Sequence, residues 1–282
     1  MSKRGLVLFA ALSVIWGLPY LFIAYAVAEL DPAVTVFART VPAAAILLAY
    51  SAFRGQLIRN LRFWQTALGF ALVEMVFPWF WISRAEQELP SGIVGLLLAT
   101  VPLFGVLIAR LRGDSSALAP KRLLGLLLGS IGVVLIVGVD ARGITPLPVL
   151  LVLLSALGYA FGPVVIERTQ GQADAATMIG FSLAFVSLLY VPVVWGKFPS
   201  TWPSGQVIWS VVVLALVCTV AAFLVFFALI AEVGPMRATL VTYINPAVAV
   251  ALGIRFAGEQ PTLGLLLGFP VVLAGSWLAS KH

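Results

Sequence analysis

The sequence predicts an all-α integral membrane protein with ten transmembrane helices, arranged as two inverted repeats of five helices. Composition is the first of three observations behind this prediction. Hydrophobic residues make up 62% of the 282 residues and charged residues 10%, whereas a soluble domain is about half apolar and about a quarter charged. The second observation is that the apolar residues gather in runs of about 20, the length that crosses a bilayer. The third is that the two halves of the chain resemble each other.

Charge and the rarest residues exclude several classes of site. The net charge is +6, but the basic residues lie in short breaks and form no basic stripe with interleaved aromatic residues, so we expect no nucleic-acid partner. The one cysteine, Cys218, lies in an apolar run, which excludes an internal disulfide and a cysteine metal site. The one histidine, His282, is the last residue, so none lies inside the chain for a zinc site, a haem or a Ser-His pair. We expect no metal and no cofactor.

The apolar runs are separated by breaks that carry the charges, glycines and prolines of loops. "ELDP" divides the first span from the second, "FRGQLIRNLR" the second from the third, and "LRGDSSALAPKR" the fourth from the fifth. Later in the chain, "GKFPSTWPSG" precedes the eighth span and "AGEQP" the tenth. The predicted spans are 5–27, 32–53, 63–83, 90–110, 122–139, 146–166, 175–196, 206–230, 235–254 and 261–280.

An even number of spans places both termini on one side of the membrane. Twelve basic residues share that side: Lys3, Arg4, Arg54, Arg59, Arg62, Arg110, Arg112, Lys121, Arg122, Arg168, Arg237 and Lys281. Four lie on the opposite side: Arg84, Arg142, Lys197 and Arg255. Because cytoplasmic loops carry the excess of Lys and Arg, we expect a multi-pass protein of the inner (plasma) membrane with both termini in the cytoplasm.

The two halves share sequence in the same order. "RLLGLLLGSIGVVLIV" matches "TLGLLLGFPVVLAG", and upstream "LLLATVPLFGVLIARLRGD" matches "LVTYINPAVAVALGIRFAGE", with Pro102 opposite Pro246. We therefore expect two five-helix repeats, 1–142 and 143–282. The alternative is a shared apolar helix pattern, in which the glycines of G-L-L-L-G serve helix packing; we assign them that packing role in either case.

An odd number of spans in each repeat makes the second copy enter the membrane from the opposite side. Inverted repeats of this kind are common in secondary transporters, whose substrate site lies near the midplane between the halves. Prolines recur in eight of the ten predicted spans. As a set they favour a mobile protein, because prolines let membrane helices bend where neighbours or water satisfy the freed carbonyls.

Three segments resemble the drug/metabolite transporter family of EamA-like proteins. They are "VIWGLPYLFIAYA", "DPAVTVFARTVPAA" and "GPMRATLVTYINPAVAVALGIRFAGEQPTLGLLLGFPVVLAG". The segment "RGDSSALAP" departs from the short G-E turn that is usual in the family. The resemblance implies ten helices, two five-helix repeats and export or exchange of small metabolites. The density of aromatic residues is most similar to the branch that exports aromatic amino acids.

An acidic residue lies in the middle of the third predicted span, in "EMVFPWFWI" (74–82). Glu74 alone in hydrocarbon would cost about 2.5 kcal/mol or more, so we expect it to face the bundle interior. At 100° per residue, Phe77, Pro78 and Trp81 share its face. We expect Glu74 to bind a substrate amine or to carry a coupling proton. The alternatives are an internal pair with Arg39 and a carboxyl group kept neutral by burial.

The remaining candidate residues are a cation and a set of polar or aromatic side chains. Arg39 lies inside the second predicted span and could receive a substrate carboxylate, or its side chain could extend to the interface. Six further aromatic residues and one amide are candidates for lining a cavity, and each is also explained as packing. They are Trp16, Tyr20, Phe77, Trp81, Tyr159, Tyr243 and Asn245.

These observations favour a secondary transporter over an enzyme. The sequence contains neither the paired aspartates, Ser-His pair or zinc motif of an intramembrane protease nor a Walker sequence for ATP. We expect export of small metabolites, chiefly aromatic and other hydrophobic amino acids, through a central cavity by alternating access. The runner-up is a broader metabolite or cationic-drug exporter. The partners would be a small-molecule substrate and the lipid bilayer; the sequence leaves the oligomeric state open, and a monomer is compatible with it.

Overall fold

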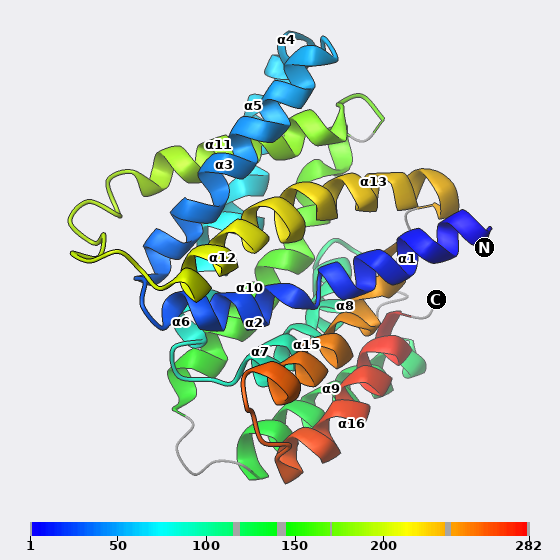
Figure 1. Cartoon of the computed structure of the whole chain (residues 1–282). Coiled ribbons are helices and arrows are strands. Elements are labelled where there is room, and N and C mark those ends of the chain that lie inside the picture. Colours follow the sequence, from blue (N-terminus) through cyan, green and yellow to red (C-terminus); the bar gives the residue numbers. More distant parts are fainter. Residues whose placement is uncertain (1, 115–118, 140–144, 170, 235–237, 281–282) are drawn as a thin grey trace.

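A computed structural model describes residues 2–114, 119–139, 145–169, 171–234 and 238–280, and this part of the chain contains helices and no strand (Figure 1). The expected boundary between 142 and 143 lies outside the described residues. The same holds for four of the residues named above: Arg142, Arg237, Lys281 and His282.

The first half of the chain contains four long apolar helical stretches and the helix α9. Their parts are α1 (Lys3–Ile15), α2 (Leu18–Val27), α3 (Pro32–Phe53), α4 (Leu57–Asn60), the 3₁₀ turn η1 (Leu61–Phe63), α5 (Trp64–Phe70), the π-helical segment η2 (Ala71–Val76), α6 (Phe77–Ala85), α7 (Ser91–Leu98), α8 (Val101–Leu111) and α9 (Pro120–Val139).

The second half follows a similar order. Its parts are α10 (Pro146–Ile166), the 3₁₀ turn η4 (Glu167–Thr169), α11 (Ala175–Tyr190), α12 (Gly205–Ala215), the π-helical segment η5 (Leu216–Ala221), α13 (Ala222–Val233), the 3₁₀ helix η6 (Thr239–Tyr243), α15 (Asn245–Phe256) and α16 (Leu263–Ser280).

In the part of the chain that the structure describes, each predicted apolar segment is largely helical. Six helices of the described chain are long and apolar enough to cross a membrane, and further apolar helices are shorter. The predicted bounds 32–53 and 146–166 match α3 and α10. In contrast, α11 ends six residues before the predicted 196, because Pro192 has no N–H to continue the helical ladder.

Local sequence explains where several helices begin. Asp31 accepts a hydrogen bond from the Ala33 N–H at 2.8 Å, and Pro32 supplies the fixed φ of a first helical turn. Asp174 caps α11 in the same way by accepting a hydrogen bond from the Thr177 N–H at 3.0 Å. These caps satisfy N–H groups that have no partner inside the helix.

Glycines determine the pairing of α9 with α16, which lie side by side at the bottom of Figure 1. A Cβ added to Gly125 would stand 2.8 Å from the Cα of Ala279, and one added to Gly132 would stand 2.7 Å from the backbone nitrogen of Val272. Only glycine allows the two backbones to approach this closely. The packing role expected for the G-L-L-L-G glycines is therefore confirmed at Gly125.

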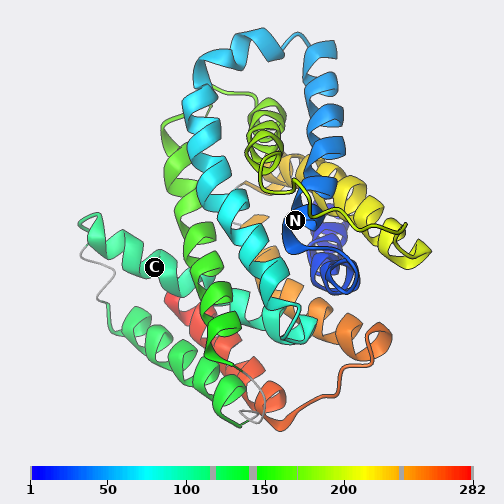
Figure 2. The same ribbon diagram turned by 90° about the vertical axis from the view of Figure 1, so that its left-hand side faces the viewer.

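Other helices that are distant in sequence also pack together (Figures 1 and 2). The helix α3 packs along α11, α6 along α10, α2 along α12, α1 along α13, and α7 along α15. Large hydrophobic side chains such as Leu6, Leu111 and Leu188 remain exposed on the outside of the bundle. A bilayer explains this surface, because exposed apolar side chains contact lipid without any cost of hydration.

Candidate functional site

Two π-helical segments lie in the long helical stretches 57–85 and 205–233. They are η2 and η5, and each inserts into an otherwise α-helical stretch. Glu74 is the fourth of the six residues of η2, and Thr219 is the fourth of the six residues of η5. Single π-helical turns within α-helices are frequent at functional sites. These two turns therefore indicate where in the interior a functional site is expected.

Glu74 points toward α10. Its carboxylate lies against Gly162, where a Cβ at position 162 would collide with Oε2, and the ring of Phe70 lies beside it. Oε2 is buried and has no hydrogen-bond partner. Pro78 lies on the same side, with its Cγ 2.9 Å from the position of a Cβ on Gly158. A buried carboxylate oxygen without a partner is costly unless a ligand or a proton satisfies it.

The backbone carbonyls around the π-helical turn have partners on neighbouring helices. The Tyr190 hydroxyl on α11 donates a hydrogen bond to the Val76 carbonyl at 2.7 Å. The Ser155 hydroxyl on α10 donates to the Pro78 carbonyl at 3.2 Å. These bonds hold η2 and the start of α6 against two helices of the second half, which fixes the position of Glu74.

Arg39 is buried in the middle of the bundle, with 5% of its surface exposed. Its guanidinium carbon lies 4.0 Å above the ring of Trp79, and Nη2 donates a hydrogen bond to the Thr219 hydroxyl at 3.0 Å. Nε has no partner. The side chain therefore does not extend to the membrane interface. The ion pairs of the described chain do not include Glu74 with Arg39, so the internal pair given as an alternative is not formed.

Two of the other sequence candidates, Tyr20 and Tyr159, lie near these charges, together with Glu86, which was not a candidate from the sequence. Tyr20 interacts electrostatically with Glu86 and Tyr159, Arg39 with Glu86 and Tyr159, and Glu74 with Tyr159. Tyr20 and Tyr159 keep part of their surface accessible although they lie deep in the bundle. We call Tyr20, Arg39, Glu74, Glu86 and Tyr159 the interior polar group.

Phe77 and Trp81 lie apart from the interior polar group. Phe77 is 49% exposed, and its ring stacks on that of Trp81 with centroids 5.5 Å apart. The expected shared face with Glu74 assumed α-helical geometry, whereas η2 ends directly before Phe77. A π-helical turn contains an additional residue, so the rings rotate away while Pro78 remains on the side of Glu74.

Trp16, Tyr243 and Asn245 form packing contacts near helix breaks. Trp16 lies at the break between α1 and α2 and packs 4.8 Å from the Phe226 ring of α13. The Tyr243 hydroxyl donates to the Ser276 carbonyl at 3.2 Å. Asn245, with its amide nitrogen facing the carbonyls, donates to Val241 at 2.9 Å and to Ser13 at 3.0 Å. These contacts join α1, η6 and α16.

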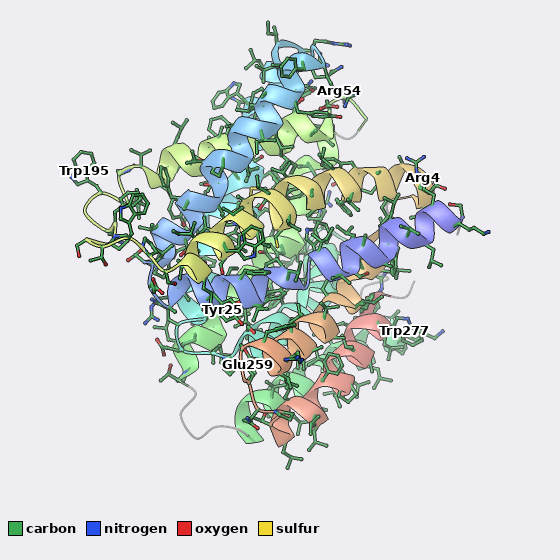
Figure 3. All side chains as sticks on the ribbon, in the orientation of Figure 1. Arg4, Tyr25, Arg54, Trp195, Glu259 and Trp277 are labelled. Carbon is green, nitrogen blue, oxygen red and sulfur yellow. The ribbon has the colours of Figure 1, made fainter. Side chains whose placement is uncertain are left out.

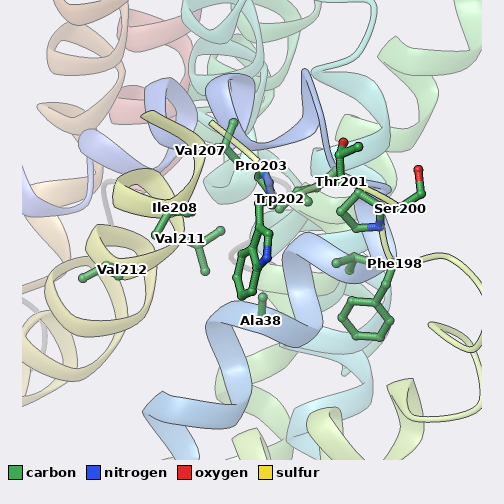
Figure 4. A pocket seen from close by; sticks show the side chains of 13 residues that line it. Ala38, Phe198, Ser200, Thr201, Trp202, Pro203, Val207, Ile208, Val211 and Val212 are labelled. Carbon is green, nitrogen blue, oxygen red and sulfur yellow. The ribbon is translucent and has the colours of Figure 1, made fainter. Parts of the chain in front are cut away.

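Two open pockets lie away from the interior polar group. One has a volume of about 410 Å³ and lies between α3, α12 and the loop that carries Trp202 (Figure 4). Its lining is almost entirely apolar. The other, of about 460 Å³, is lined by Gln65, Thr66, Arg112, Val164, Val165 and Glu167. Its lining comes from α5, from α10 and from the residues directly after α8 and α10.

At the opposite end of the bundle, the loop after α15 contacts the start of α7 and the side chain of Tyr25. The Glu259 carboxylate accepts hydrogen bonds from the N–H and hydroxyl of Ser91, each at 2.6 Å, and from the Gly92 N–H at 3.0 Å. The Tyr25 hydroxyl donates to the Phe256 carbonyl at 2.7 Å. Figure 3 shows Tyr25 and Glu259 at this end of α2 and α15.

A family model for EamA-like transporters matches residues 3–138 and, a second time, residues 146–281. The chain belongs to the EamA-like transporter family. The resemblance stated from the sequence is confirmed at this level. The family's members are membrane transporters of the drug/metabolite transporter superfamily, so the chain has a small-molecule substrate and a membrane environment, and these findings indicate a transporter rather than an enzyme.

Individual relatives of this EamA-like chain are themselves described only as transporters. The "Uncharacterized inner membrane transporter YedA" of Escherichia coli K12 is 31% identical over 251 residues, which cover 88% of this chain and 81% of the relative. The "Uncharacterized transporter YvbV" of Bacillus subtilis is 25% identical over 283 residues, 99% of this chain and 92% of the relative. A solved structure described as "Crystal structure of protein" has a TM-score of 0.68 at 20% identity and covers 99% of this chain and 97% of its own; it supports the fold alone.

Proposed function

We propose that this EamA-like protein is a secondary transporter of the inner membrane that exports aromatic and other hydrophobic amino acids by alternating access. The observation that carries the proposal is the interior polar group. It contains a buried cation, Arg39, a buried carboxylate, Glu86, and the partly buried Glu74 with one buried oxygen, and the described chain pairs none of them in an ion pair. Buried charges without partners are expensive, and a ligand that carries charges of its own would satisfy them.

We further propose ten transmembrane helices in two inverted five-helix repeats, with both termini in the cytoplasm. The two matches of one family model to 3–138 and 146–281 support the repeat. So do the paired π-helical segments η2 and η5 and the paired interruptions between α7 and α8 and between η6 and α15. Related positions in the two repeats would then meet at the interior polar group.

The roles in transport follow from position. Glu74 binds the substrate amine or carries a coupling proton, and Arg39 receives the substrate carboxylate. Trp79 and the two tyrosines Tyr20 and Tyr159 provide apolar ring surface for the substrate side chain. The pocket lined by Gln65 and Arg112 would admit substrate from the cytoplasm, because its lining residues on α5 and α10 belong to the helical stretches that also carry Glu74 and Gly162.

The test uses purified protein in liposomes preloaded with unlabelled phenylalanine, with uptake of labelled phenylalanine as the readout. We expect saturable exchange that tryptophan and other apolar amino acids inhibit best and that Glu74→Gln weakens. Glu88→Gln is the matched control, because Glu88 lies in the turn directly after the same helical stretch but is exposed and paired with Arg84 at 2.7 Å. Unchanged exchange by Glu74→Gln at every pH would remove both proposed roles of Glu74.

A cationic-drug exporter is the second candidate, and the two interior carboxylates Glu74 and Glu86 favour it. In this alternative the acids attract a cation and Arg39 serves only to bind Thr219 and Trp79. Exchange of a quaternary cation, with no exchange of any amino acid by the same preparation, would replace the amino acid exporter by this candidate.

A further inference from the structure

The turn between α6 and α7 contributes a buried acid that lies outside every apolar run of the sequence. Glu86 directly follows the last residue of α6 and has 7% of its surface exposed. Neither of its carboxylate oxygens has a hydrogen-bond partner. The next two residues, Gln87 and Glu88, are exposed. Glu86 alone of the three is therefore turned into the protein, at the cost of two unsatisfied acceptors.

The cation that acts on Glu86 is Arg39. The two side chains interact electrostatically, yet they form no ion pair within 4 Å in the described chain. The other groups that act on Glu86 are Tyr20 and the backbone of Ala24, both from α2, and Glu259 from the loop after α15. The Ala24 N–H lies beside the carboxylate but does not reach it with normal hydrogen-bond geometry. Glu259 is occupied by its hydrogen bonds to Ser91 and Gly92. Arg39 and Glu86 are thus both buried and close enough to interact, but they do not form an ion pair with each other.

The contacts of Arg39 with Trp79 and Thr219 keep its guanidinium away from Glu86. The face of the Arg39 guanidinium lies on the Trp79 ring and Nη2 is bonded to Thr219, whose hydroxyl also donates to the Leu214 carbonyl at 2.7 Å. Nε is buried and free. A planar guanidinium held in this way presents its remaining N–H groups in a fixed direction, which suits bidentate recognition of a carboxylate.

We propose that Arg39 and Glu86 together form a binding site for a zwitterion, in which Arg39 receives the carboxylate of an α-amino acid and Glu86 receives its ammonium group. The inference deepens the proposed export of amino acids and rests on it. It assigns the amine to Glu86 and so leaves Glu74, against Gly162, as the group that carries the coupling proton. Trp79 stacks under Arg39, and Tyr20 and Tyr159 lie near the two charges; these three rings would contact the substrate side chain.

This arrangement predicts that the site prefers substrates that carry both an ammonium group and a carboxylate over substrates that carry only one of them. A substrate that lacks the amine leaves Glu86 without a partner, and one that lacks the carboxylate leaves Arg39 without one. A site whose buried polar groups stay unpaired rejects such analogues strongly. We expect 2-phenylethylamine and 3-phenylpropionate each to compete with phenylalanine at least about tenfold more weakly than phenylalanine itself.

The experiment measures competition by these three compounds and by glycine betaine for labelled phenylalanine in proteoliposomes. It compares the wild type with Arg39→Gln, Glu86→Gln and the double variant. We expect Glu86→Gln to lose the preference for phenylalanine over 3-phenylpropionate and to keep its preference over 2-phenylethylamine. Arg39→Gln should do the reverse. The double variant has a neutral interior at these positions, so it tests the site without leaving one charge uncompensated, and it should lose both preferences. Glu88→Gln is the control and should keep both.

The outcomes separate the two proposals. Exchange of phenylalanine with unchanged analogue preferences in the Arg39 and Glu86 variants would overturn the zwitterion site and leave the amino acid exporter standing. Exchange of another zwitterion but not of phenylalanine, with the preferences shifting as described, would support the site and replace the substrate. If the wild type transports only compounds with a single charge, or no zwitterion of the panel is transported or bound, the inference falls.

Discussion

The carboxylate of Glu74 occupies the space that a side chain on Gly162 would need. Glu74 lies in the π-helical segment of the stretch 57–85, and Gly162 lies on α10 in the other half of the chain. Below them, a Cβ on Gly69 would stand 3.3 Å from the Val165 side chain. The acid therefore depends for its position on the absence of a methyl group on the facing helix.

Replacing that glycine tests the dependence directly. Gly162→Ala should displace the end of the flexible Glu74 side chain rather than any backbone, so we expect the loss of stability to stay within about 1 kcal/mol. Transport should fall at least about tenfold, since the proposed proton carrier moves. The measurements are exchange in liposomes and the unfolding temperature in detergent. Gly105→Ala is the control, because nothing lies within 4 Å of its added Cβ. Full transport by Gly162→Ala would contradict the proposed role of Glu74.

Sequence periodicity and composition were sufficient to predict the helices but not the irregularities within them. The ends of α3 follow from Asp31, Pro32 and the polar break after Phe53. In contrast, nothing in the apolar runs distinguishes a π-helical turn from an α-helical one, because the same hydrophobic residues satisfy both. The face predicted for Phe77 was wrong for this reason, since it depended on 100° per residue.

The candidate site was predictable only where a charge stood inside an apolar run. Glu74 and Arg39 met that condition, and the structure brings both to the interior polar group together with Tyr20 and Tyr159. Glu86 did not meet it, because it belongs to the turn "AEQE" and resembles its exposed neighbours. Its burial is decided by packing between α2, α6 and α7, which sequence reasoning on one chain does not provide.

The Glu259 carboxylate caps the N-terminus of α7 from a loop of the other half. Glu259→Ala removes acceptors from the Ser91 N–H and hydroxyl and from the Gly92 N–H, so we expect a loss of about 0.5–2 kcal/mol, as for an N-cap. Glu259→Gln keeps one carbonyl acceptor and should lose less. The unfolding temperature in detergent provides the measurement. Equal stability of the wild type and Glu259→Ala would show that water replaces the cap.

A hydrogen-bonded contact between two exposed loops should make the stability of the protein depend on pH in the acidic range. Hydrogen bonds from Ser204, first from its side chain and then from its backbone N–H, lower the pKa of Glu29 from 4.5. Since the folded pKa lies below the unfolded one, the stabilisation is fully present above pH 4.5 and is lost as the pH falls through the lowered pKa. Glu29→Gln should therefore be less stable than the wild type at neutral pH. The difference in unfolding temperature should shrink as the pH falls below 4.5 and through the lowered pKa, and a difference that stays constant as the pH falls would refute the linkage.

Thr219 determines how the Arg39 guanidinium is held, so its hydroxyl should affect substrate affinity. Thr219→Val keeps the shape of the side chain but removes the acceptor for Nη2 and the donor to the Leu214 carbonyl. A buried hydrogen bond to a charged group contributes about 1.5–3 kcal/mol, so we expect KM for amino acid exchange to rise about tenfold or more, with a smaller change in maximal rate. Thr40→Val is the matched control, because Thr40 follows Arg39 in α3 and donates to the Phe37 carbonyl at 3.1 Å instead. If both variants change KM equally, the effect belongs to packing along α3 and not to the position of the arginine.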